Sequence, residues 1–381
     1  MRRDTSAADD RLINPYLLLT PGPLSTTPTV REAMLKDWCT WDDDYKSIVQ
    51  DVRARLITVA CDRNNAEQHT VVLMQGSGTF AVEAAIGSIV PQNAGLLLVS
   101  NGAYGLRMVE IADRTRKTVH HLRFSETDPL DPAGIVQHIE RNPGIQFVAF
   151  VHCETTTGML NPLPEIVQSV KSRGMTVIVD AMSSFGGIPI DVPGIGIDVL
   201  ISSANKCIQG VPGFGFVIVR RDVISKCNGN SHSLALDLYD QWTTFEQDKG
   251  KWRYTSPTHT VRAFQQALIE LEEEGGVEAR HQRYRQNHRA LVSGMENSGF
   301  RCLLPKHLRS PIITSFCYPA TNHFQFKEFY QKLKEGGFVV YPGKVSNADT
   351  FRIGTIGNVF PHDMTRLTKA VAQISTAADQ S

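Results

Sequence analysis

Two ionisable residues end apolar segments in the middle of the chain. Asp180 closes the run Thr176–Asp180, and Lys206 follows the run Val199–Ala204. Lysine is disfavoured beside buried strand residues unless its amine is used or paired. Desolvation lowers the pKa of such an amine, so its neutral form becomes available as a nucleophile and a base. Taken singly, each residue has an ordinary alternative, because aspartate caps turns and lysine extends its amine to solvent.

A glycine-rich turn precedes both residues. The segment Gln75–Ala81 reads QGSGTFA and directly follows the apolar run Val71–Met74. Glycines let a backbone turn tightly and approach an anion, and the N–H groups at the start of a following helix favour a phosphate there. The side chains of Ser77 and Thr79 add hydroxyl donors. We therefore interpret the turn as a phosphate site.

Two alternative motifs require residues that the chain lacks. A dinucleotide site shares the spacing of Gly76, Gly78 and Ala81, but it needs an acid at the end of the next strand, where Ser100 and Asn101 stand. A P-loop needs Gly-Lys-Ser/Thr after its glycines, and this triplet is missing. The alternative that this turn only connects a strand to a helix, without binding a ligand, stays open. The histidines lack the spacing of a zinc motif, so no metal site is predicted.

Together, the three features match the needs of one cofactor. Pyridoxal 5'-phosphate needs an anion site for its phosphate, a carboxylate that keeps its ring nitrogen protonated, and a lysine that bonds to its aldehyde. The chain offers the turn at Gly76–Thr79, then Asp180, then Lys206. This combination predicts a pyridoxal phosphate enzyme with Lys206 and Asp180 as its catalytic residues.

Alternating strand-like and helix-like segments must position these residues. The strand-like segments are Val71–Met74, Leu96–Asn101, Phe147–His152, Thr176–Asp180, Val199–Ala204 and Phe214–Val219. Most are continuous apolar runs, as expected of strands that helices cover on both faces. Helix-like segments lie between them, and Asp131 before Pro132 has the pattern of a helix N-cap. The alternation predicts an α/β fold with a mostly parallel sheet.

The pattern changes after about residue 255. A helical segment places Val261, Phe264 and Leu268 on one face and stops at Gly275–Gly276, and an α+β pattern follows. We therefore predict a large domain over residues 1–255, which includes an N-terminal segment, and a smaller domain over residues 256–381. A basic cluster in the second domain, interpreted as solvated surface, consists of Arg280, Arg283, Arg285 and Arg289.

The composition disfavours several classes of function. The 381 residues carry 39 Lys and Arg against 39 Asp and Glu, so the formal net charge is zero. Binding to nucleic acid or to an anionic membrane through a positive net charge is therefore not expected. No run approaches the ~18 apolar residues of a membrane span, and the first residues lack the apolar core of a signal peptide. Seven cysteines without a Cys-x-x-Cys pair fit free thiols in a reducing compartment. We expect a cytoplasmic protein with small-molecule partners.

Motifs along the chain are shared with one enzyme family. They are Leu19–Pro23 (LTPGP), Gly76–Thr79 (GSGT), Asn101–Gly105 (NGAYG), His152–Gly158 (HCETTTG), Asp180–Ala181, Asn205–Lys206 and Phe351–Gly354 (FRIG). On these residues, the chain from about Leu17 onward resembles class V aminotransferases of the aspartate-aminotransferase fold. The resemblance implies pyridoxal phosphate fold type I, with a large cofactor-binding domain and a smaller C-terminal α+β domain. It also implies a homodimer whose active sites lie at the interface.

The resemblance implies roles for single residues around the cofactor ring. Lys206 bonds to the cofactor aldehyde and later moves the proton between substrate and cofactor. Asp180 pairs with the pyridine nitrogen. The ring of Tyr104 stacks on the cofactor, with core packing as its alternative, and the hydroxyl of Thr155 lies near the cofactor ring, with Thr156 as a substitute.

The resemblance also implies residues that bind the cofactor phosphate and the acidic group of the substrate. The residues implied for the cofactor phosphate are Ser77, Gly78, Thr79 and Ser203, together with Thr255, which would reach the phosphate of the other subunit. Arg352 would bind the acidic group of the substrate, because a buried guanidinium requires a fork-shaped anion. An internal salt bridge is the alternative for Arg352.

Four longer stretches resemble one branch of the family. They are Trp41–Tyr45, Asp180–Gly187, Ser202–Phe214 and Tyr254–Thr260. That branch transfers the amino group of 2-aminoethylphosphonate to pyruvate, giving phosphonoacetaldehyde and L-alanine. An alanine– or serine–glyoxylate aminotransferase of the same family is the alternative, and a nucleotide-binding oxidoreductase or a non-enzymatic binding domain is the third hypothesis. We interpret the acidic run Asp42–Asp44 as ordering a loop or the dimer contact.

Overall fold

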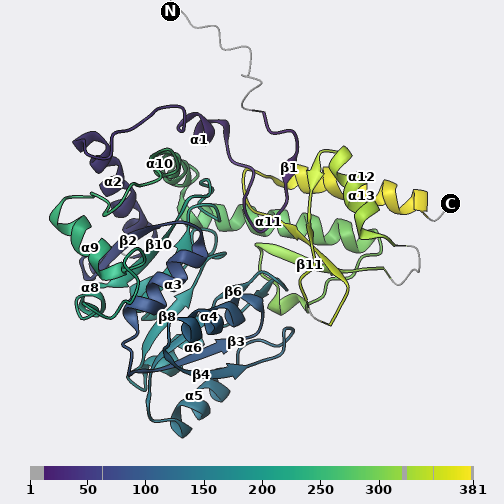
Figure 1. Cartoon of the computed structure of the whole chain (residues 1–381). Coiled ribbons are helices and arrows are strands. Elements are labelled where there is room, and N and C mark those ends of the chain that lie inside the picture. The colour runs from purple at the N-terminus through teal and green to yellow at the C-terminus, as the bar shows by residue number, and fades with distance from the viewer. Residues whose placement is uncertain (1–12, 62, 320–323, 346, 379–381) are drawn as a thin grey trace, which may run out of the picture.

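The largest sheet of the protein has seven strands, in the order β2-β10-β9-β8-β5-β3-β4 (Figure 1). The computed structural model describes residues 13–61, 63–319, 324–345 and 347–378. The strands are β2 (His69–Gln75), β3 (Gly95–Ser100), β4 (Thr118–Arg123), β5 (Ile145–Val151), β8 (Thr176–Asp180), β9 (Val199–Ser203) and β10 (Phe214–Arg220). Only β10 among them runs antiparallel to its neighbours. The predicted α/β fold with a mostly parallel sheet is confirmed.

The burial of each strand explains whether its sequence shows a continuous apolar run. In the central strands, runs such as Leu96–Val99 and Val177–Val179 are buried residue after residue, because helices pack on both faces of the sheet. The edge strand β4 differs, since every residue of its segment Thr118–Arg123 is exposed or only partly buried. The prediction lacked β4 because an edge strand needs no continuous apolar run.

Ten longer helices and several short ones are defined in the described residues. The longer helices are α2 (Asp43–Ala60), α3 (Gly78–Ile89), α4 (Ala103–Arg114), α5 (Pro132–Arg141), α6 (Leu163–Lys171), α9 (Leu238–Gln247), α10 (Thr258–Glu273), α11 (Gly276–Asn297), α12 (Phe326–Glu335) and α13 (Pro361–Ala378). The short ones are α1 (Pro28–Glu32), α7 (Val192–Ile195), α8 (Arg221–Ile224) and the 3-10 turns η2 (Arg63–Gln68) and η3 (Lys306–Leu308). The predicted N-cap at Asp131 is confirmed, because its carboxylate accepts from the N–H groups of Ala133 and Gly134.

The acidic run Asp42–Asp44 opens helix α2 rather than ordering a loop. Asp42 is the N-cap, and Asp43 and Asp44 lie in the first turn. Carboxylates are favoured there because the helix dipole places partial positive charge at its N-terminus. The loop interpretation is therefore wrong, and the structure of this chain leaves the dimer contact a prediction.

The C-terminal part is built on a small antiparallel sheet. Its strands run in the order β11 (Ile313–Cys317), β14 (Thr350–Gly354) and β13 (Tyr341–Pro342). Two further strand pairs are β1 (Leu17–Leu18) with β12 (Phe338–Val339), and β6 (Cys153–Glu154) with β7 (Met159–Leu160). In Figure 1 the N-terminal segment passes from β1, which lies beside α12 and α13, across to α1. Residues near the start of the chain thus join the C-terminal part.

Two large apolar clusters underlie these parts. The first lies around the seven-stranded sheet and includes Val261, Phe264 and Leu268 of α10. The second joins Leu19 to Leu291 and other apolar residues of the C-terminal sheet and helices. The division after residue 255 stays a prediction, and residues 1–12 of the predicted first domain lie outside the described residues.

Candidate active site

A cavity of about 170 Å³ lies at the edge of the sheet where β2, β8 and β9 end. These strands point the same way, so the side chains that follow them meet at one edge. The cavity is lined by Ser77, Gly78, Thr79, Val82, Tyr104, Arg107, Met108, Asp180, Met182, Ser203, Asn205 and Lys206. It therefore brings together the predicted residues of the glycine-rich turn, both catalytic candidates, Tyr104 and Ser203.

Lys206 follows β9 and reaches into the cavity. Its Nζ donates a hydrogen bond of 2.8 Å to the carbonyl oxygen of Pro21. Burial lowers the pKa of this amine from 10.5 to about 8, while the nearby Cys207 and Asp180 oppose the shift. A neutral amine is thus accessible near physiological pH, as a nucleophile or base requires.

Asp180 is the last residue of β8 and is buried. Its Oδ1 accepts a hydrogen bond of 2.8 Å from the N–H of Met182. Burial raises the pKa of this carboxyl from 3.8 to about 6, against the effects of that hydrogen bond and of Lys206. A cation seated beside Asp180 would favour the charged carboxylate, which is the environment that a protonated pyridine nitrogen supplies.

The start of α3 has the features of an anion site. Ser77 is its N-cap, yet the Ser77 side chain makes no capping hydrogen bond. A Cβ at Gly78 would lie 2.4 Å from Sδ of Met182, so glycine at this position lets the Met182 side chain pack against the start of the helix. Arg107 Nη1 donates to Oγ1 of Thr79 at 3.2 Å. Helix N–H groups, hydroxyls and a guanidinium together suit a phosphate.

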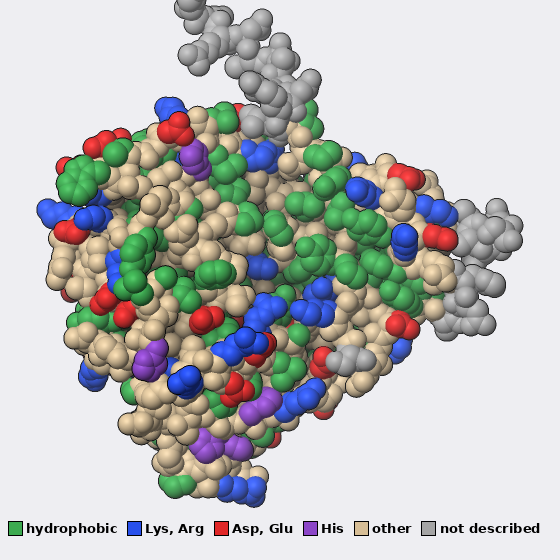
Figure 2. Space-filling view, in the orientation of Figure 1, with side chains coloured by type: hydrophobic (Ala, Val, Ile, Leu, Met, Phe, Trp, Pro, Cys, Tyr) green, Lys and Arg blue, Asp and Glu red, His purple; other side chains and the backbone are tan. Residues whose placement is uncertain are grey.

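Arg107 was missed by the sequence reasoning, although it lies three residues after Tyr104. Residues three apart lie on the same side of a helix, so a predicted role for Tyr104 could have drawn attention to Arg107. The guanidinium carbon of Arg107 lies 4.9 Å from the centre of the Tyr104 ring, and Nζ of Lys344 lies 5.5 Å from it. Figure 2 shows Lys and Arg side chains gathered near the middle of the viewed face, between the positions of β6 and β11 in Figure 1.

Arg352 lies on β14 and is buried. It donates to the carbonyl oxygens of Pro342, at 3.1 Å, and of Thr155, at 3.0 Å. Burial lowers the pKa of its guanidinium, and Tyr104 and Tyr341 oppose this shift. No ion pair joins Arg352 to a carboxylate within the described ranges, so the internal salt bridge considered for it is not formed there. The charge of Glu154 and the side chain of Tyr104 also favour the charged guanidinium, and the binding of a substrate acid by Arg352 stays a prediction.

Three predicted residues, Arg352, Thr155 and Thr255, lie outside the cavity lining. Thr155 is buried, and its contact with the site is the carbonyl that Arg352 binds. Thr255 is exposed on this chain, just before α10. Its contact with a phosphate of the other subunit stays a prediction.

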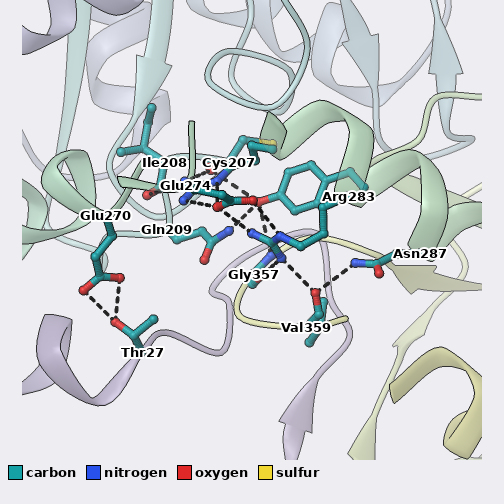
Figure 3. Close-up of polar contacts among 12 residues, drawn as sticks. Thr27, Cys207, Ile208, Gln209, Glu270, Glu274, Arg283, Asn287, Gly357 and Val359 are labelled. Carbon is teal, nitrogen blue, oxygen red and sulfur yellow. Dashed lines mark hydrogen bonds and ion pairs between the residues drawn. The ribbon is translucent and has the colours of Figure 1, made fainter. Parts of the chain in front are cut away.

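The cluster of α11 arginines is a buried ion-pair network, so its interpretation as solvated surface is wrong for two of its members (Figure 3). Arg280 is 2% exposed and donates to Glu274 and to the carbonyl oxygens of Cys207 and Ile208. Arg283 donates to Glu274 as well, and also to main-chain oxygens of residues 357 and 359. The turn between α10 and α11 folds Glu274 back over both arginines, which periodicity cannot show. The network ties the residues after Lys206 to the C-terminal part.

The cavity therefore has the groups that pyridoxal 5'-phosphate requires: a phosphate site, a buried acid and a buried amine. The fold and the site define a pyridoxal phosphate enzyme of fold type I. Among the described residues, no group of three or more His, Cys, Asp or Glu side chains could hold a metal ion. Nor does any described helix combine the length and apolar character that spanning a membrane requires.

The family follows from comparison with known sequences. The family model Aminotransferase class-V matches residues 44–348. A 2-aminoethylphosphonate–pyruvate transaminase of Syntrophobacter fumaroxidans is 61% identical over 357 residues, which cover 94% of this chain and 95% of that protein. One of Bacteroides fragilis is 58% identical over 362 residues, covering 95% and 99%. The chain belongs to the class V aminotransferases.

Solved structures agree on the fold. The pyridoxamine–pyruvate aminotransferase of Mesorhizobium loti superimposes with a TM-score of 0.88 at 22% identity, covering 98% of this chain and 95% of that one. An alanine–glyoxylate aminotransferase of Nostoc gives 0.86 at 23% identity, covering 98% and 97%. The expected fold type is confirmed.

Proposed function

We propose that this enzyme transfers the amino group of 2-aminoethylphosphonate to pyruvate and releases phosphonoacetaldehyde and L-alanine. The observation that carries the proposal is that transaminases of this name are 58–61% identical to the chain over about 95% of its length. The geometry supports it, because an amine, a carboxyl and an anion site surround one cavity. In the overall exchange the amino group and the carbonyl oxygen change places between the two carbon skeletons.

The residues divide the work as follows. When bound, pyridoxal phosphate supplies an aldehyde that captures the substrate amine and a ring that accepts electrons from the neighbouring carbon. Lys206 Nζ takes the proton from that substrate carbon and gives it to the cofactor carbon C4′. The lowered pKa of the amine, about 8, favours this role. Asp180 holds the proton on the ring nitrogen. Arg352 binds the acidic group of either substrate, so both are oriented by the same cation.

The charge around the site suits these substrates. Arg107 and Lys344 lie within 5.5 Å of the Tyr104 ring centre, and Arg352 is buried near that tyrosine. Each substrate brings an acidic group, a phosphonate or a carboxylate. Cations that are already in place lower the cost of desolvating these groups.

An absorbance experiment tests the substrate. Holoenzyme is mixed with 2-aminoethylphosphonate alone, and the absorbance of the bound aldehyde form should give way to that of the amino form. Pyruvate should then restore the original spectrum. Conversion by serine or alanine, with glyoxylate as the preferred acceptor and no response to 2-aminoethylphosphonate, would establish the alternative activity.

Covalent mapping tests the cofactor chemistry. Borohydride reduction followed by peptide mass mapping should find a pyridoxyl group on Lys206. Lys206→Ala should lose that adduct and nearly all turnover, whereas Lys369→Ala, on the exposed face of α13, serves as the control. An unmodified Lys206 in reduced holoenzyme contradicts the proposal and favours a nucleotide-binding or non-enzymatic protein.

The proposal extends to assembly and location. We expect a homodimer in which Thr255 of one chain reaches the phosphate bound by the other, since Thr255 is exposed on its own chain. Sedimentation velocity should give twice the chain mass of 42.2 kDa, and Thr255→Ala should weaken cofactor binding. We also expect a cytoplasmic enzyme, which its seven free cysteines favour.

A further inference from the structure

A buried carboxylate outside the proposed chemistry lies between the parts of the site that carry Tyr104 and Arg352. Glu154 is the second residue of β6 and is 0% exposed. Its Oε2 accepts from the N–H groups of Tyr104, at 3.2 Å, and of Gly105, at 3.4 Å. These amides belong to the first turn of α4, where helix N–H groups lack partners within the helix.

The other oxygen of the same carboxylate binds the segment that follows it. Glu154 Oε1 accepts from the N–H of Thr156, at 3.3 Å, and from its hydroxyl, at 2.7 Å. The preceding residue, Thr155, offers its carbonyl to Nη1 of Arg352 at 3.0 Å. One side chain is thus bonded to the backbone of Tyr104 and to the segment that carries the Arg352 contact.

Packing leaves Glu154 little freedom to move. A Cβ at Gly102 would lie 2.3 Å from Cγ of Glu154, so the absence of a side chain at Gly102 lets the carboxylate approach α4. Burial raises the pKa of Glu154, and its hydrogen bonds from Thr156, Gly105 and Tyr104 oppose this shift. A buried carboxylate with donors on both oxygens is costly to replace, because any new group must satisfy the same N–H groups.

We propose that Glu154 is a positioning residue of the active site. It holds the Tyr104 ring over the cavity through the start of α4, and it holds the Arg352 guanidinium through Thr155 and Thr156. The two contacts are made by different oxygens of the carboxylate. The Arg352 half of the inference rests on the proposed function, in which that residue binds substrate.

Glu154→Gln separates the two contacts. The amide has one oxygen, which can keep the two N–H donors of α4, and one NH₂, which then faces Thr156. The Thr156 hydroxyl can turn to accept from the NH₂, but the Thr156 N–H cannot, so the segment at Thr155 must shift. The expected result is a rise of roughly 10-fold in KM for both 2-aminoethylphosphonate and pyruvate, with cofactor affinity preserved, as the loss of one hydrogen bond to a charged group implies. Glu154→Ala should also weaken cofactor binding by roughly 10-fold, because both contacts are lost.

The control is a second carboxylate that accepts hydrogen bonds at the start of a helix, away from the active site. Asp131 accepts from two backbone N–H groups at the start of α5, and Asp131→Asn should lower the melting temperature without moving either KM. Thr156→Val removes only the hydroxyl bond to Glu154 and should raise both KM values less than Glu154→Gln does. It keeps the inference testable if the Glu154 variants fail to fold.

The outcomes are distinct. If Glu154→Gln behaves like Asp131→Asn, with a lower melting temperature and unchanged KM values, Glu154 is merely structural and the inference is overturned. Calorimetry can measure how tightly wild type and variant bind the unreactive acids ethylphosphonate and propionate. These affinities report on the Arg352 contact without turnover. If wild type does not act on 2-aminoethylphosphonate, the proposed function fails, whereas a selective loss of acid binding in Glu154→Gln still supports the inference.

Discussion

The amine of Lys206 donates a hydrogen bond of 2.8 Å to the carbonyl oxygen of Pro21, which lies 185 residues earlier in the chain. Pro21 belongs to the segment after Leu19, whose side chain is buried in the second apolar cluster. The N-terminal segment therefore connects the C-terminal part to the amine of the large sheet. Until a cofactor bonds to it, the Lys206 side chain is held in one place by this carbonyl.

Gly22→Ala tests how closely that segment approaches the amine. Gly22 has φ +129°, and a Cβ there would lie 2.8 Å from Nζ of Lys206. We expect turnover to fall by roughly 100-fold, because displacing a reacting group by about 1 Å can cost that much. Gly174→Ala is the matched control, since Gly174 also has a positive φ, +76°, but has open space around it. Equal activity losses in both variants would show that backbone strain alone is responsible.

The lowered pKa of Lys206 predicts how pH controls cofactor capture. Only the neutral amine attacks an aldehyde, so the rate at which apoenzyme bonds added pyridoxal phosphate should rise with pH and level off above about 8. If the amine had the ordinary pKa of 10.5, the rate of cofactor capture would still be rising with pH at pH 10. Stopped-flow absorbance between pH 6 and 10, with each buffer checked for unfolding, measures the midpoint. A midpoint near that ordinary value contradicts the burial argument.

Asp180→Asn should separate stability from activity. Because burial raises the pKa of Asp180 from 3.8 to about 6, the folded apoenzyme binds this proton more tightly than the unfolded chain does. The stability that this group contributes is complete below pH 3.8 and is lost as pH rises through about 6. At pH 8 the Asn variant of the apoenzyme should therefore be more stable than wild type, by on the order of 3 kcal/mol.

The same variant should lose roughly 100-fold or more in turnover, because the neutral amide cannot hold a proton on the ring nitrogen. Thermal unfolding of the cofactor-free proteins at pH 5 and pH 8 provides the check, and the difference between them should shrink at the lower pH. A variant that is less stable than wild type at both pH values would show that the carboxylate is not destabilised by burial.

Arg352→Lys tests the fork-shaped geometry of the guanidinium. The ammonium keeps the charge but cannot bind two oxygens side by side, nor reach both Pro342 and Thr155. KM for both substrates should rise by roughly 10-fold, as the loss of one charge-assisted hydrogen bond of about 1.5 kcal/mol implies. Steady-state kinetics measure this, with Arg289→Lys on α11 as the control. An unchanged KM for both substrates would remove Arg352 from the substrate site.

Lys344→Met addresses the choice between the two acids. Nζ of Lys344 lies 5.5 Å from the Tyr104 ring centre, and the residue is exposed. A phosphonate resembles a phosphate, which carries about 1.5 to 2 negative charges, whereas a carboxylate carries one. KM for 2-aminoethylphosphonate should rise by roughly 2- to 5-fold, more than KM for pyruvate, since an exposed charge contributes little. Lys369→Met is the control, and an equal rise for both substrates would show that Lys344 does not distinguish the two acids.

The amino-acid sequence by itself determined the cofactor class and the main elements of the fold. Asp180, Lys206 and the turn at Gly76–Thr79 could be recognised because each follows a continuous apolar strand, and parallel strands end at one edge of a sheet. The family motifs added the substrate. Edge strand β4 was not predicted, since its residues form no continuous apolar run. Helix α2 was overlooked, although Tyr45, Ile48, Val49, Val52 and Leu56 recur at helical spacing and are buried.

Only the tertiary structure decided which distant residues meet. Arg352 bonds to Thr155 across 197 residues, and Glu154 joins Tyr104 to Thr156. Arg280 looked like solvated surface because charge along a helix carries no record of the turn that folds Glu274 over it. Such contacts depend on how helices and strands pack, and local periodicity reports only which face of an element is buried.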